Sequence, residues 1–72
     1  MKPPSNPMIP ALLTWSELPG GKRYELWHTP QVKNARYHVI FLIGGTEVGK
    51  HAHDNEIVAR NDFERRVEGH TT

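Results

Sequence analysis

The feature that most constrains the fold is a turn signal at Pro19-Gly20. Proline presets φ for the first central position of a type II turn, and glycine accepts the positive φ of the second. The flanking residues, 12–18 and 22–28, alternate in polarity and are rich in aromatic and β-forming types. We therefore expect a β-hairpin here. Along its second strand, one face would carry Tyr24, Leu26 and His28, and the other Arg23, Glu25 and Trp27.

The strongest strand signal is at residues 36–43. Apolar residues occupy both faces of this segment, which predicts a central strand covered on two sides. Gly44-Gly45 then favours a two-residue hairpin turn. The turn would lead into a short strand at residues 46–50 and place Phe41 opposite Val48.

A helix is predicted near the C-terminus. Phe63 and Val67 are four residues apart and would meet on one helical face. Asn61, with Glu64 three residues later, fits a capping arrangement, and Gly69 suits a helix end.

The residues before Asn61 have two interpretations. Asp54 would cap a longer helix that starts at Asn55, or residues 56–60 would form a strand. The sequence favours a helix over residues 61–68 and leaves residues 55–60 open.

These elements predict an α+β fold, in which a small antiparallel sheet of three to four strands packs against a C-terminal helix. Four prolines within residues 1–10 predict a disordered or polyproline-like tail. Residues 11–69 would form a single small domain, and residues 70–72 a frayed end.

A chain of 72 residues, 36% of them hydrophobic, leaves little room for a walled reaction pocket. Its acidic residues form no paired motif, and no serine stands in a nucleophile context. We therefore expect neither enzyme activity nor a cofactor. Because we find no targeting segment and no apolar run near 20 residues, we expect a cytoplasmic protein without a membrane partner.

Two motifs suggest other chemistry. Residues 44–50 read G-x-x-x-x-G-K, but His51 stands where a phosphate-binding loop needs Ser or Thr. A glycine hairpin is the better interpretation. His51 and His53 would share a strand face and could chelate zinc or nickel, with Asp54, His28 or His38 as a third ligand. A His-based metal-binding domain is therefore one alternative, although solvated histidines explain the motif more simply.

A net charge of +1 argues against a dedicated nucleic-acid binder. Arg60, Arg65 and Arg66 could contact phosphates, but glutamates interleave with them at helical spacings and would pair with them. A small nucleic-acid-binding module remains the second alternative, and its affinity would fall steeply with salt.

Aromatic and apolar residues point instead to protein binding. Met8 and Ile9 are apolar although prolines surround them, and an extended segment loses little entropy when it docks in a groove. Trp and Arg are enriched at the energetic centres of interfaces, and an edge strand can recruit a partner by its backbone. The predicted partner-binding set is Met8, Ile9, Leu12, Leu13, Trp15, Arg23 and Trp27.

The stretch from PMIPALLTWSELPGGKRYELWHTPQ through ARYHVIFLI resembles the small transcription regulators of lytic Xanthomonas phages. The resemblance extends over nearly the whole chain. It implies a protein that binds the β′ subunit of the host bacterial RNA polymerase, inhibits sigma-dependent initiation and acts as an antiterminator. We also expect a monomer. No residue-level motif of these regulators carries over, so the partner-binding set rests on residue chemistry alone.

Overall fold

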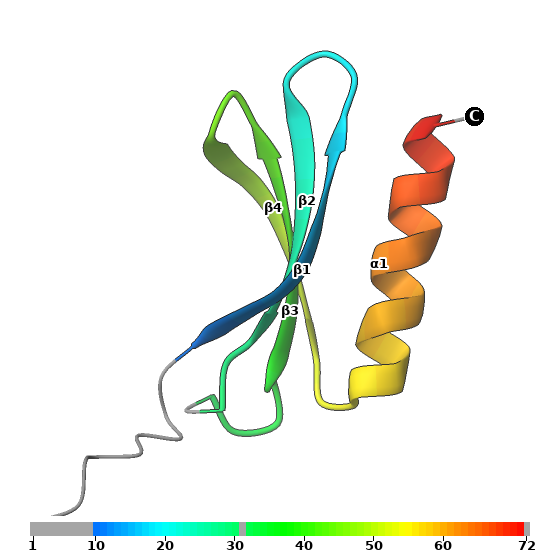
Figure 1. Cartoon of the computed structure of the whole chain (residues 1–72). Helices are drawn as coiled ribbons and strands as arrows, with labels where there is room; N and C mark the ends of the chain where they lie inside the picture. The colour runs from blue at the N-terminus through cyan, green and yellow to red at the C-terminus, as the bar shows by residue number, and fades with distance from the viewer. Residues whose placement is uncertain (1–9, 31, 72) are drawn as a thin grey trace, which may run out of the picture.

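The computed structural model describes residues 10–30 and 32–71. These residues form four strands and one helix: β1 (Ala11–Leu18), β2 (Lys22–His28), β3 (Tyr37–Ile43), β4 (Thr46–His53) and α1 (Glu56–Thr71). The strands make one antiparallel sheet in chain order, and α1 lies along one of its faces (Figure 1). The predicted α+β fold with a C-terminal helix is confirmed. The predicted tail lies outside the described residues except for Pro10.

Glycines at positive φ make both hairpin turns. Gly20 and Gly21 have φ values of 82° and 75° between β1 and β2, and Gly44 and Gly45 have 60° and 84° between β3 and β4. Both predicted hairpins are therefore confirmed, although the first turn also uses Gly21. The N–H of Gly44 donates to the carbonyl of Gly21 at 2.9 Å, which joins the tips of the two hairpins.

The register of β4 differs from the prediction. Phe41 lies opposite Gly49 rather than Val48, and Leu42 lies opposite Glu47. Val48 is thus an extra residue on β4, as in a β-bulge, which shifts all later pairs by one. The strand also continues to His53 instead of ending at Lys50.

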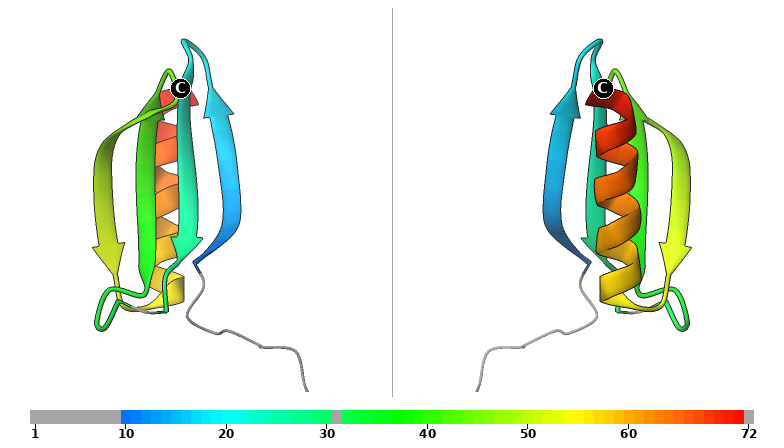
Figure 2. Two further views of the ribbon diagram at one scale, coloured as in Figure 1. Left: turned by 90° about the vertical axis from the view of Figure 1, so that its left-hand side faces the viewer. Right: turned by 90° about the vertical axis from the view of Figure 1, so that its right-hand side faces the viewer.

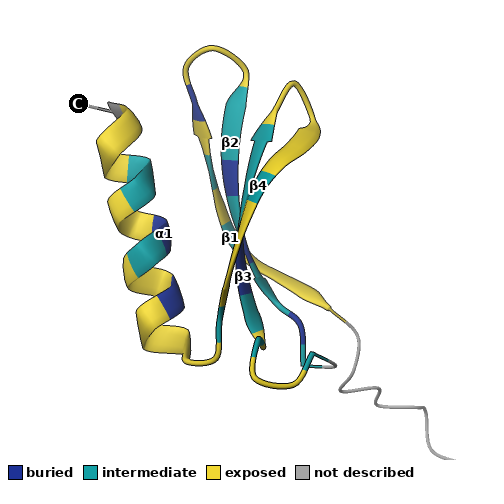
Figure 3. Ribbon diagram, turned by 180° about the vertical axis from the view of Figure 1, so that it is seen from behind, coloured by how far each residue is buried: buried dark blue, intermediate teal, exposed yellow. Residues whose placement is uncertain are grey.

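The core lies between α1 and the sheet. Figure 3 shows that the buried part of α1 is the side turned toward the strands. Phe63 and Val67 meet there as predicted, and the ring of Tyr24 stacks on Phe41 with centroids 4.6 Å apart. The buried apolar residues are Leu18, Tyr24, Leu26, Val39, Ala59 and Phe63.

The helix begins earlier than Asn61. Asn55 caps it, because its Oδ1 accepts the N–H groups of Ile57 and Val58 at 2.8 and 3.2 Å. The capping role predicted for Asn61 is therefore wrong, as is the alternative of Asp54, and residues 56–60 are helical. Asn61 lies inside the helix, where the backbone N–H groups already have helical partners.

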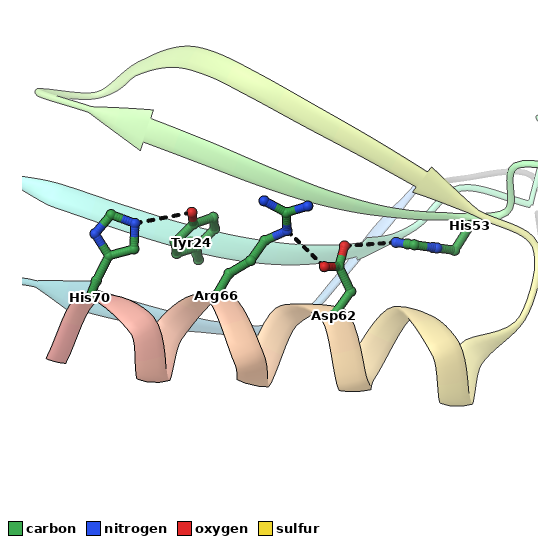
Figure 4. A network of polar contacts seen from close by, with 5 residues as sticks. All are labelled: Tyr24, His53, Asp62, Arg66 and His70. Atoms are coloured by element: carbon green, nitrogen blue, oxygen red, sulfur yellow. Dashed lines mark hydrogen bonds and ion pairs between the residues drawn. The ribbon is translucent and has the colours of Figure 1, made fainter. Parts of the chain in front are cut away.

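The helix also ends later than predicted. It continues past Gly69 to Thr71, so the expected stop at Gly69 is wrong. The frayed end expected at residues 70–72 stays a prediction. The ring of His70 explains the extra turn. It stacks on Phe41 at 5.4 Å between centroids, and its Nε2 lies 3.3 Å from the Tyr24 hydroxyl (Figure 4).

The sheet is covered on one side. Figure 2 shows α1 on a single face, across β2 and β3. β3 is a central strand as predicted, but within the described residues no second layer covers its other face. Residues 10–30 and 32–71 therefore supply cover on one side only, in place of the predicted cover on two. The helix is too short and too polar to cross a bilayer.

Candidate interaction surface

The face of the sheet turned away from α1, here called the open face, gathers aromatic, aliphatic and charged side chains. Strand alternation produces it: Tyr24 and Leu26 are buried toward the helix, so their neighbours in β2 point the other way. Directly opposed residues share a face, which extends the assignment across the sheet. The open face comprises Leu12, Leu13, Trp15, Glu17, Arg23, Glu25, Trp27, His38, Ile40, Leu42, Glu47, Lys50 and Ala52.

β1 supplies the most exposed apolar part of this face. Trp15 lies opposite Glu25 and is 54% exposed. Leu12 lies opposite Trp27, and a register shift between Leu12 and Thr14 leaves Leu13 as an extra residue, two positions before Trp15. Leu12 and Leu13 are exposed to 36% and 37%. An irregular strand end therefore presents two leucines on the same side as Trp15.

The structure brings the predicted partner-binding residues together. Leu12, Leu13, Trp15, Arg23 and Trp27 all belong to the open face, on the neighbouring strands β1 and β2. Met8 and Ile9 lie outside the described residues. The sequence prediction missed Ile40 and Leu42, because apolar residues on both faces of β3 had indicated burial on both sides. Both are only partly buried.

A polar network fixes the side chains at the centre of the open face. The guanidinium carbon of Arg23 lies 5.2 Å from the centroid of the Trp15 ring, within cation–π range. Arg23 Nε lies 2.9 Å from Glu25 Oε2, and the guanidinium also pairs with Glu17 at 3.7 Å. The Trp27 indole N–H donates to Glu25 Oε1 at 2.8 Å. One cation thus faces two carboxylates, which offset its positive charge.

His38 is a buried residue of the open face, at the end where β3 begins. It is 9% exposed, and its Nδ1 lies 3.3 Å from the Thr29 hydroxyl. Thr29 already donates its one hydroxyl hydrogen to the carbonyl of Ala35, so the Nδ1–H of His38 must donate to Thr29. Burial, assisted by the positive charge of Lys50, lowers the pKa of His38, and Glu47 only partly opposes this. The neutral ring therefore ties the β2–β3 connection to the sheet.

The histidines of the predicted metal motif lie on the opposite side. His51 and His53 share the face turned toward α1, as the period of a strand requires. His53 Nε2 lies 2.8 Å from Asp62 Oδ2, and Arg66 Nε donates to Asp62 Oδ1 at 2.7 Å (Figure 4). Partial burial would raise the pKa of Asp62, but the hydrogen bonds from His53 and Arg66 outweigh it, and the pKa is lowered.

His53 and Asp62 therefore form a clamp between β4 and α1. No group of three or more His, Cys, Asp or Glu side chains in residues 10–30 and 32–71 is arranged to share a metal ion. The depression beside the clamp is lined largely by charged and polar side chains of α1. Residues 44–50 form the β3–β4 turn and the first part of β4, whereas a phosphate-binding loop leads into a helix.

The chain matches no protein-family model, no curated protein and no solved structure.

Proposed function

We propose that the protein is a non-enzymatic regulator that acts by binding a larger protein through its open face. One observation carries the proposal: Trp15 and Trp27 lie with Leu12 and Leu13 on the face that α1 leaves uncovered. Contiguous exposed apolar residues with a polar rim are typical of interaction sites. Tryptophans within such patches contribute a large share of binding free energy.

The charges of the open face favour a protein partner over a nucleic acid. Proteins that stack bases on exposed aromatic rings also supply a cationic groove for the phosphates. Here the guanidinium beside Trp15 is paired with Glu25 and Glu17. Glu47 further offsets Lys50 on the same face. The face is therefore slightly acidic around its aromatic centre, which disfavours a polyanionic ligand.

Bacterial RNA polymerase, engaged through its β′ subunit, is the partner we propose. The support is the resemblance of residues 7–43 to small phage transcription regulators. In this proposal a monomer of the protein binds polymerase in the host cytoplasm, prevents productive engagement of sigma and so inhibits initiation. The same complex would allow elongating polymerase to read through terminators. No cofactor takes part.

The test is a binding titration with purified polymerase and two matched variants. Trp15→Ala removes an exposed ring from the open face, and Ile57→Ala removes a 70% exposed side chain from α1. We expect Trp15→Ala to raise the Kd about tenfold or more and Ile57→Ala to leave it unchanged. Circular dichroism and the Tm check that both variants fold. Equal Kd values for Trp15→Ala and the parent chain would exclude the open face as the docking surface.

A transcription assay separates binding from regulation. The parent chain should inhibit initiation by sigma-containing polymerase at concentrations near its Kd, and Trp15→Ala should need a proportionally higher concentration. Binding without any effect on initiation or termination would contradict the regulatory role and leave the docking surface intact.

A further inference from the structure

The two edge strands of the sheet differ in how well they could accept a further strand. β1 and β4 are the edges, and an edge strand carries N–H and C=O groups that its single neighbour does not use. β4 carries Lys50 and the bulge at Val48, both of which discourage strand addition. β1 contains no Lys, Arg or Pro, and its single charged residue is Glu17.

The edge of β1 is also accessible. Figure 2 shows α1 behind the two middle strands, with β1 at the outside of the sheet. Trp15 is 54% exposed, and the side chain of Glu17 is 75% exposed. The register with β2 is regular from Thr14 to Leu18, because the irregularity is confined to the segment before Thr14. An added strand of about five residues can therefore pair with the regular edge from Thr14 to Leu18.

We propose that the edge of β1 binds an extended partner segment as a fifth strand, and that this segment places a basic side chain beside Glu17. This inference rests on the proposed function, because it states how the partner is held. Antiparallel pairing matches every other pair in the sheet and is the more stable arrangement per residue.

Charge complementarity selects the basic residue. Glu25 already pairs with Arg23 at 2.9 Å, whereas Glu17 pairs with it only at 3.7 Å and is largely exposed. One guanidinium cannot neutralise both carboxylates, so negative charge remains at the Glu17 end of β1. A Lys or Arg directly across from Glu17 compensates it.

The side chains of β1 point alternately to the two faces of the sheet, and this alternation determines the residue types of the partner segment beyond its basic residue. Trp15 shares the open face with Glu17, so its partner across the new pair is apolar, and a further apolar residue two positions later lies beside Leu13, just outside the regular part of the edge. Thr14 and Ser16 point to the other face and take small polar partners. In the antiparallel direction the segment reads basic, polar, apolar, polar, apolar. A capped peptide Gly-Lys-Thr-Val-Thr-Leu-Gly has this pattern.

The experiment is an amide NMR titration of the full chain with this peptide. We expect shift changes and slowed hydrogen exchange along β1, centred on Trp15 and Glu17, with β4 unchanged. A peptide with Glu in place of Lys should bind at least about tenfold more weakly, a loss of about 1.4 kcal/mol. Glu17→Gln should reduce this discrimination to less than about threefold, whereas Glu47→Gln, on the other edge strand, should preserve it.

Several outcomes would overturn strand addition. They are shifts on β4 instead of β1, equal affinity for the Lys and Glu peptides, or no shift at the highest soluble peptide concentration. Shifts at β1 that grow with protein concentration alone would assign the edge to a second copy of this chain and also overturn it. If Trp15→Ala weakens polymerase binding while the peptide leaves β1 unperturbed, the docking face stands and strand addition fails. If Trp15→Ala changes nothing, the proposed function fails by itself.

Discussion

Glu25 holds Trp27 in place: the indole N–H donates to Oε1 of the carboxylate at 2.8 Å, and the other oxygen lies 2.9 Å from Arg23 Nε. Both side chains therefore have a preferred orientation before any partner arrives. A preorganised aromatic side chain loses less conformational entropy on binding. Part of the open face is thus oriented before binding, through the contacts of Glu25 with Trp27 and Arg23.

Removal of the Glu25 carboxylate should destabilise the fold. Glu25→Ala leaves the indole N–H of Trp27 without its acceptor and removes the nearer of the two carboxylates that pair with Arg23, and we expect the unfolding free energy to fall by about 1–2 kcal/mol. Glu25→Gln should lose less, because its amide oxygen can still accept from Trp27. Urea unfolding followed by tryptophan fluorescence measures both. Glu64→Ala, on the exposed side of α1, is the control and should change stability by less than about 0.5 kcal/mol.

The helix cap offers a second matched comparison. Asn55→Ala removes the acceptor for two backbone N–H groups and should cost about 1 kcal/mol. Asn61→Ala, an exposed position inside α1, should be neutral or slightly stabilising because alanine favours helix. Thermal unfolding by circular dichroism ranks the two. A larger loss at Asn61 would show that the helix begins there after all.

His38 predicts a pH dependence of stability. Its pKa is lowered in the folded chain, so the unfolded chain binds more protons near neutral pH. The unfolding free energy should therefore be highest above the usual His pKa of about 6.5 and fall as the pH drops through it toward the folded value. His38→Gln should flatten this slope relative to the parent chain. His51→Gln, at an exposed position, should keep it, and equal slopes for both variants would reject the assignment.

Asp62 predicts an effect at lower pH. Its folded pKa lies below the usual 3.8, so its contribution is complete above that value and is lost as the pH falls through the folded pKa. Asp62→Asn should lower the unfolding free energy at pH 7 by about 1 kcal/mol, because it weakens the contacts to His53 and Arg66. The difference from the parent chain should shrink in acid. A constant difference down to the acid transition would contradict the clamp.

Two glycines should respond in opposite directions to alanine. Gly69 lies inside α1, and a methyl group there would meet no atom within 4 Å, so Gly69→Ala should stabilise the fold by up to about 1 kcal/mol. Gly45 has a φ of 84°, which strains any residue with a Cβ, so Gly45→Ala should destabilise it. Both changes are measured by chemical denaturation, and a gain at Gly45 would contradict the turn geometry.

Local patterns predicted much of the fold because their causes are local. The glycines at both turns and the period-two alternation of β2 correctly indicated the hairpins and the faces of Arg23, Glu25 and Trp27. The register of β4 could not be read in this way. The isolated glycine at position 49 is compatible with a bulge, but it does not say that Val48 is the extra residue, because that depends on how β4 pairs with β3.

The remaining misses depend on tertiary position. Asn55 and Asn61 are equally good caps by residue type. Because β4 ends at His53, the helix can begin directly after Asn55, and Asn55 becomes the cap. The apolar side chains of Ile40 and Leu42 predicted a second layer over the other face of β3. Their hydrophobicity does not tell whether that layer comes from this chain or from a partner. The partner-binding set was chosen by residue type, and its described members did gather on one face. Their contacts through Glu25 needed the pairing of β1 with β2, and the polymerase partner stays a prediction.

The order of the elements has a consequence for synthesis. All four strands precede α1, which supplies Ala59 and Phe63 to the core. A ribosome therefore synthesises the four strands before α1. Leu26 and Val39 stay exposed to water until the 16 residues of α1 have left the ribosome and packed on the sheet. A nascent chain that stalls within that helix would present apolar strand faces on both sides to chaperones and proteases.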